Sequence, residues 1–123
     1  MKRLFNPSKV QPIAAGVYHR QSAPAEQPPY RIHLRLQADG SGVLILNAAT
    51  VMHLNSTAAE YAYHFIKGTE TELVAHEVAS RYRVSRDQAL HDFEDFASRI
   101  EILASSTDLD PVAYLDFERV APH

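Results

Sequence analysis

Residues 51–68, VMHLNSTAAEYAYHFIKG, decide the fold because a strand pattern passes into a helix pattern with no loop between them. The first four residues form a short apolar run that carries a methionine and a histidine. Thr57 to Glu60 then match a capping box, in which a threonine and a glutamate satisfy each other's backbone amides. Apolar residues recur at helical spacing until Gly68, a typical helix-ending residue. The stretch therefore predicts a strand followed at once by a helix of residues 57–67.

Two further strands are expected upstream of this one. The run RIHLRL, residues 31–36, alternates polar and apolar side chains, as a half-buried strand does. QADGSG then supplies a hairpin turn through Asp39 and Gly40, and VLILN, residues 43–47, is uniformly apolar like a central strand. With TVMHLN, residues 50–55, as the third member, the strands form an antiparallel meander.

Two further helices follow downstream. Residues 71–82 repeat apolar side chains with a helical period, and Thr69 or Thr71 is the expected N-cap. Residues 86–103 carry a continuous apolar stripe that begins after Ser85, which forms a capping box with Gln88. A three-stranded antiparallel sheet followed by three helices predicts an α+β fold that is winged helix-turn-helix-like.

The predicted domain covers residues 30–104 and leaves a segment on either side. Residues 1–29 contain five prolines and predict an extended N-terminal arm. An added edge strand at residues 10–18 is the alternative for this arm. Residues 105–123 are interpreted as a C-terminal tail whose apolar residues either dock on an unspecified surface or lead into a further domain.

The composition excludes several classes of protein. A chain of 123 residues with 46% hydrophobic residues fits one soluble globular domain. The absence of cysteine rules out disulfides, thiolate nucleophiles and cysteine-ligated metals, and it favours a reducing cytoplasm. The sequence has no signal-peptide pattern and no apolar run of membrane length, so we expect a cytoplasmic protein with no membrane partner.

Motifs for catalysis and for cofactors are missing from the sequence. The seven histidines include no pair spaced four apart on one helix, and no HExxH motif occurs. A nucleophile elbow and a phosphate-binding glycine loop are also missing, and the chain has only four glycines. We therefore expect no metal, no cofactor and no enzymatic activity. The remaining interpretation is that the histidines are partly exposed, hydrogen-bonded side chains, namely His33, His53, His64 and His91, and that His76 is a surface residue of the second helix.

DNA binding is the alternative that a winged-helix layout raises, because its recognition helix normally lies in the major groove. Here residues 86–103 hold five carboxylates against two guanidiniums. Such a surface repels phosphates, which supply most of the affinity of ordinary DNA binders. A DNA-binding transcriptional regulator is therefore only the alternative function, and we expect no nucleic-acid partner.

The third strand points instead to peptide binding. It ends the meander and carries no lysine or proline, so one row of its backbone groups is open to an added strand. The third helix would flank this edge with an aromatic anchor and two charged residues on successive turns. The predicted peptide-binding residues are Thr50, Val51, Met52, His53, Leu54, Asp92, Phe96 and Arg99.

Three alternatives stay open at this edge. Phe96 is alternatively a core residue, with Asp92 and Arg99 as a solvated pair. The open edge alternatively pairs with a second copy of the chain, as in an oligomerisation module. Met52 and His53 occupy adjacent strand positions and point to opposite faces, so at most one of them packs inward.

In their order and spacing these elements resemble the PqqD-like domain, also called the RiPP precursor peptide recognition element. The resemblance is carried by LNSTAAEYAYHFIKG and the following TETELVAHEVASRY, residues 54–82. These residues match, in order, the family's Leu-Asn, Thr-Ala pair, apolar helix, glycine, Thr-led helix and tyrosine. The resemblance as a whole covers about residues 30–104. Two features depart from the family pattern. Lys67 replaces the usual acidic residue, and SRIEILASS lacks the glycine usual near the end of the last helix.

The resemblance implies a non-catalytic chaperone that binds the leader of a ribosomally synthesised precursor peptide as an added strand. It implies delivery of that peptide to a modifying enzyme, which in the PqqD case is a radical S-adenosylmethionine (radical SAM) enzyme. Carried over by position, residues 50–54 would face the peptide, with Asp92, Phe96 and Arg99 opposite. We expect a monomer or a weak homodimer. The departures favour a divergent member that serves another precursor or is fused in nature to its maturase.

Overall fold

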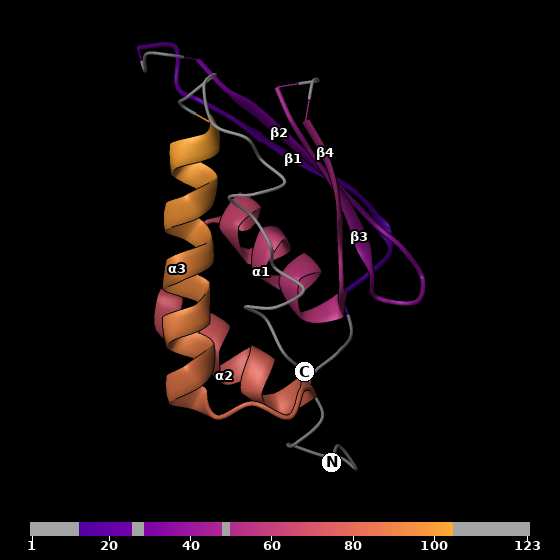
Figure 1. Cartoon of the computed structure of the whole chain (residues 1–123), viewed down its shortest axis with the longest axis vertical. Helices are drawn as coiled ribbons and strands as arrows, with labels where there is room; N and C mark the ends of the chain where they lie inside the picture. The colour runs from indigo at the N-terminus through magenta and orange to yellow at the C-terminus, as the bar shows by residue number, and fades with distance from the viewer. Residues whose placement is uncertain (1–12, 26–28, 48–49, 105–123) are drawn as a thin grey trace, which may run out of the picture.

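A computed structural model of the chain describes residues 13–25, 29–47 and 50–104. These residues form a four-stranded antiparallel sheet followed by three helices that pack on it (Figure 1). The α+β class is thereby confirmed. The predicted C-terminal tail lies outside the described residues, as do residues 1–12 of the predicted arm.

The sheet has one strand more than the sequence predicts. Its strands are β1 (Gly16–Gln21), β2 (Arg31–Leu36), β3 (Gly42–Leu46) and β4 (Thr50–Leu54), in that spatial order. The additional strand β1 lies in the predicted arm and pairs antiparallel with β2. Within the predicted arm, residues 16–21 thus form an edge strand, as the alternative proposed at the earlier bounds of residues 10–18. The physical reason is that residues 13–23 contain no proline, so β1 can donate its amides to β2.

The β2–β3 hairpin is built by the predicted Asp39–Gly40 turn. The Gln37 amide donates to the Ser41 carbonyl at 2.8 Å, and Asp39 Oδ1 accepts from the Ser41 amide at 2.9 Å. Hydrogen bonds from the Ser41 hydroxyl and amide lower the pKa of the exposed Asp39 carboxyl. Gly40 adopts a φ of 93°, which a residue with a side chain rarely does.

The helices are α1 (Ser56–Lys67), α2 (Thr71–Arg81) and α3 (Arg86–Ala104), all within one residue of the predicted bounds. Two of the three N-caps differ from prediction. Asn55, not Thr57, caps α1, because its Oδ1 accepts from the Ala58 amide at 2.9 Å. Glu70 precedes α2 without a side-chain cap, so the predicted threonine cap is also wrong. The Ser85 cap of α3 is confirmed by a 3.1 Å hydrogen bond from the Gln88 amide.

The core lies between the inner face of the sheet and the helices, all of which lie on that side (Figure 1). Alternate sheet residues such as Ile32, Leu34 and Leu44 are almost fully buried there. Gly42 allows β3 to approach α1 closely, since a Cβ at this position would lie 3.0 Å from that of Ala59. Within the part of the chain that the structure describes, no helix is long and apolar enough to cross a membrane.

Candidate functional site

The predicted peptide-binding strand is the edge strand β4. It pairs antiparallel with β3 on one side, from Thr50 opposite Leu46 to Leu54 opposite Gly42. Among the residues that the structure describes, no strand lies along its other side. Alternate residues of β4 therefore direct their amide and carbonyl groups away from the sheet, where a further strand could pair with them.

The register shows which β4 side chains face the helices. Met52 lies opposite Leu44, whose side chain is buried, and Met52 itself packs against the core. Val51 and His53 face the other side of the sheet, where Val51 is 57% exposed and His53 is exposed. Of the adjacent residues Met52 and His53, Met52 is thus the one that packs inward, and His53 faces outward.

The three predicted residues of α3 have different environments. Phe96 is only 1% exposed and lies 6.1 Å from the Tyr61 ring, so it is a core residue as the alternative held. Asp92 and Arg99 are half-buried. Arg99 pairs with Asp95 at 3.0 Å, whereas Asp92 accepts from the Gln88 side chain at 2.7 Å. An apolar anchor at Phe96 is therefore not available at the surface of the protein.

Asn47 joins the end of α3 to the turn between β3 and β4. Its Nδ2 donates to the Ala104 carbonyl at 3.2 Å, and its Oδ1 accepts from the Arg31 amide at 2.8 Å. Asn47 adopts a φ of 54°, a left-handed conformation that asparagine tolerates well. The C-terminal end of α3 is thus held near the residues that precede β4.

Two buried polar atoms near α3 have no hydrogen-bond partner among the described residues. They are the Tyr61 hydroxyl and Asp92 Oδ2. Burial raises the pKa of Asp92, and repulsion from Asp95 adds to this effect although the Gln88 hydrogen bond opposes it. Burial and the nearby Asp92 charge likewise raise the pKa of Tyr61. Asp92 is therefore a carboxylate whose charge is poorly satisfied within the domain.

A buried ion-pair network, which sequence reasoning missed, links α1 to α2. Arg81 donates to both oxygens of Glu60 at 2.8 and 2.5 Å and to Glu77 at 3.0 Å. His64 Nε2 lies 3.1 Å from Glu60, and its Nδ1 lies 3.1 Å from the Thr69 hydroxyl. Glu60 and His64 are 3% and 2% exposed, so the network is largely removed from water and the expectation of a partly exposed His64 is wrong.

The network keeps the Glu60 carboxyl charged despite its burial. Burial opposes ionisation, but hydrogen bonds from His64 and Arg81 together outweigh it and lower the pKa of Glu60. Burial likewise opposes the charge on Arg81, yet its bonds to Glu60 and Glu77 raise the pKa of the guanidinium. In this network, the charges of Arg81 and the two glutamates neutralise one another through direct hydrogen bonds.

Among the described residues, one group could also hold a metal ion, namely Glu60, His64 and Glu77. Their ligand atoms lie within 4.8 Å of one another. Arg81 already bonds both carboxylates, so a cation would have to replace its guanidinium. This donor set therefore fits the observed ion pairs better than a metal site.

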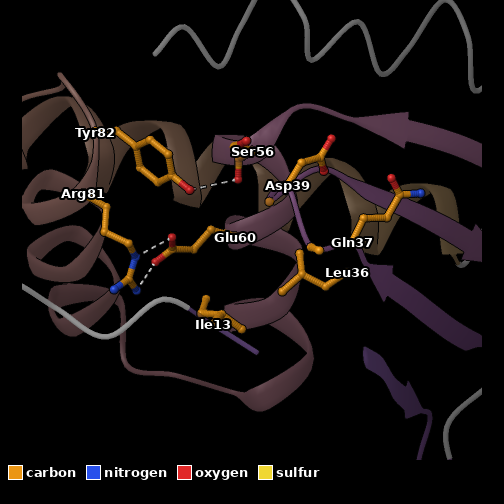
Figure 2. Close-up of a pocket in the computed structure, with 10 residues that line it drawn as sticks. Ile13, Leu36, Gln37, Asp39, Ser56, Glu60, Arg81 and Tyr82 are labelled. Atoms are coloured by element: carbon orange, nitrogen blue, oxygen red, sulfur yellow. Dashed lines mark hydrogen bonds and ion pairs between the residues drawn. The ribbon is translucent and has the colours of Figure 1, made fainter. Parts of the chain in front are cut away.

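A pocket of about 200 Å³ opens between the β2–β3 turn, the start of α1 and the end of α2 (Figure 2). Each of its charged side chains already has a partner, because Glu60 pairs with Arg81 and Asp39 accepts from Ser41. Tyr82 donates to the Ser56 carbonyl at 3.4 Å, and burial raises the pKa of its phenol to about 12. The pocket is thus lined by satisfied polar groups and by Ile13, Leu36 and Ala38.

The fold and the site define a small α+β domain with an open edge strand. Comparison of the chain with protein-family models, with curated proteins and with solved structures finds no match.

Proposed function

We propose that this protein is a chaperone that binds the leader of a ribosomally synthesised precursor peptide as an added strand on β4. The observation that carries the proposal is the outer edge of β4, which has no pairing strand among the described residues. Edge strands of this kind bind extended peptides through backbone hydrogen bonds, and side-chain contacts supply specificity.

The composition of β4 favours such pairing. Natural edge strands are commonly protected by lysine, proline, a bulge or very short length. The strand TVMHL contains neither lysine nor proline, and its register with β3 is continuous over five residues. A peptide therefore has a regular edge to pair with, although a short one.

An added strand would meet a different surface on each of its two faces. Because side chains alternate along a strand, residues pointing to the helix side would meet Met52, and those pointing outward would meet Val51 and His53. Asp92 and Arg99 are the proposed charged residues on the α3 side. Phe96 supports this side from within the core, since its ring is buried.

Delivery to a modifying enzyme is part of the proposal, and a radical SAM maturase is the proposed enzyme. This step rests on the resemblance of residues 30–104 to the PqqD-like domain. The proposal that the fold is winged helix-turn-helix-like rests instead on the order of its strands and helices. The saturated ion-pair network supports a binding role rather than catalysis by this chain, because its charged groups already bond one another.

The test is a backbone amide NMR titration of the chain with the leader part of the precursor peptide encoded beside its gene. We expect shifts at residues 50–54 and along α3. The proposed site is wrong if these residues do not respond while others do, and the function is wrong if no leader binds.

A pair of substitutions on opposite edges of the sheet sharpens this test. Val51→Lys adds a charge to the β4 edge and is expected to weaken leader binding by about tenfold, since lysine protects natural edge strands. Val17→Lys is the matched control on β1, because Val17 and Val51 are similarly exposed at 63% and 57%. Equal effects of the two substitutions would contradict binding at β4.

A further inference from the structure

The outer face of the sheet is uncovered within the part of the chain that the structure describes, since all three helices lie on the inner side (Figure 1). The strand register arranges its side chains in two complete rows across the four strands. We call this surface the outer sheet face. Its residues are Val17, Arg35, Val43 and His53 in one row, His19, His33, Ile45 and Val51 in the other, and Gln21 and Arg31 at one end.

None of these ten residues is acidic. Arg31 and Arg35 are exposed on β2, and the rings of His19 and His33 lie 5.9 Å apart on neighbouring strands. The central strand β3 contributes only aliphatic side chains, Val43 and Ile45, and both are half-buried. The outer sheet face therefore combines an aliphatic centre with basic side chains beside it, a pattern common in protein interfaces.

The rest of the domain has the opposite charge. The chain has a net charge of −3, and α3 alone holds five carboxylates against two guanidiniums. A solvated sheet face with no partner is expected to mix charges of both signs. The complete separation of acidic residues from the outer sheet face therefore points to a negatively charged partner.

We propose that the outer sheet face docks an acidic surface of a partner protein that presents carboxylates around aliphatic residues. A protein partner fits better than a nucleic acid for two reasons. The ten residues include no lysine and no Phe, Tyr or Trp on which bases could stack. In addition, the acidic helices would repel a long polyanion. The proposal differs from the edge-strand site, because it uses side chains on the face of the sheet and not the backbone groups of its edge. Val51 and His53 belong to both surfaces.

The size of the surface predicts a transient complex. Four strands about 4.8 Å apart give a face roughly 15 Å wide. With strands of five or six residues at about 3.3 Å per residue, the area of this face is roughly 300 Å². One side of a stable protein interface is larger, at about 800 Å² per partner. The docking surface is therefore expected to bind weakly on its own and to add affinity to a second contact.

The experiment is an NMR titration of the full chain, labelled at its methyl groups and its backbone amides, with a capped amphipathic helical peptide. The peptide has about 18 residues, with leucines on one face and glutamates on both flanks. We expect saturable shifts of the Val43 and Ile45 methyl groups, while the buried Leu34 and Leu44 methyls change little. The same peptide with lysine in place of glutamate is expected not to bind.

Paired variants test the role of charge. Arg31→Gln with Arg35→Gln is expected to weaken binding of the acidic peptide by about tenfold. Arg83→Gln with Arg86→Gln removes the same charge from exposed residues outside the outer sheet face and is expected to have no effect. Unchanged amide spectra check that each variant is folded. Raising the salt concentration of the unmodified chain gives a second measurement, and we expect weaker binding.

Four outcomes would overturn the proposal. They are no binding of the acidic peptide, equal binding of the lysine peptide, shifts confined to the edge amides of β1 or β4, and tighter binding of a single-stranded oligothymidylate. The third outcome would assign the peptide to a sheet edge, and the fourth would assign the outer sheet face to nucleic acid. Failure of the leader titration would leave the result of this experiment unchanged.

Discussion

At the scale of the residue, Glu60 is expected to contribute strongly to stability, because its carboxylate is buried and bonded to Arg81 and His64. Glu60→Gln would remove the charge that faces the Arg81 guanidinium. Breaking a buried pair from one side typically costs about 3 kcal/mol, so we expect a loss of this order in the free energy of unfolding at neutral pH. Urea denaturation followed by circular dichroism measures it.

The control for this substitution is the exposed pair of Arg86 and Glu72, whose atoms lie 3.5 Å apart. Arg86→Gln is expected to change the free energy of unfolding by less than about 0.5 kcal/mol. A similar small effect of Glu60→Gln would show that the buried network contributes no net stability.

The lowered pKa of Glu60 also predicts a pH dependence. The folded protein holds this pKa below its ordinary value near 4.5, so the unfolded chain takes up the proton first as the pH falls. The contribution of Glu60 is therefore complete above about pH 5 and is lost as the pH falls through the folded pKa. Urea denaturation from pH 7 to pH 3 should show the unmodified protein and Glu60→Gln converging in stability. A constant difference would contradict this assignment.

The sequence could not reveal the role of Glu60. Thr57 and Glu60 match a capping box, and this local pattern is the stronger signal in a single sequence. The partner Arg81 lies 21 residues away on another helix. The spacing of Glu60 and His64 on one helix face was the available hint, but it shows nothing about burial.

Among the elements, the start of α1 offers a direct test of the cap. Asn55→Ala would remove the acceptor of the Ala58 amide and is expected to cost about 1 kcal/mol in unfolding free energy. Thr57→Val is the control, because the Thr57 hydroxyl is buried without a hydrogen-bond partner among the described residues. Its removal is expected to be neutral or stabilising by up to about 1 kcal/mol. Thermal denaturation compares the stability of the two variants. A larger loss of stability for Thr57→Val than for Asn55→Ala would show that Thr57 caps α1.

The elements themselves were predicted well where their patterns are local. The alternation in RIHLRL and the apolar stripe of α3 each identify one buried face, so both elements lie within one residue of prediction. β1 was only an alternative because GVYHRQ lacks a regular alternation of apolar residues and stands between prolines. Its pairing with β2 depends on residues 10 or more positions away, and a single sequence does not display such contacts.

At the scale of the whole molecule, charge is separated between two sides. The outer sheet face has no acidic residue, whereas α3 is rich in them. This arrangement opposes DNA binding through α3, the mode that a winged-helix regulator would use. We expect no mobility shift of duplex DNA at low salt. A shift that weakens steeply with added salt would instead favour the regulator.

The position of Asn55 couples the β4 edge to the first turn of α1. This single residue separates β4 from α1, and its side chain holds the Ala58 amide. A strand added to β4 would restrain Asn55 as well, and the first turn of α1 would then open less often. Hydrogen exchange at the Ala58 amide is therefore expected to slow when a peptide occupies the edge. The equivalent measurement with a ligand on the outer sheet face is expected to leave this exchange rate unchanged, so one amide distinguishes the two modes of binding.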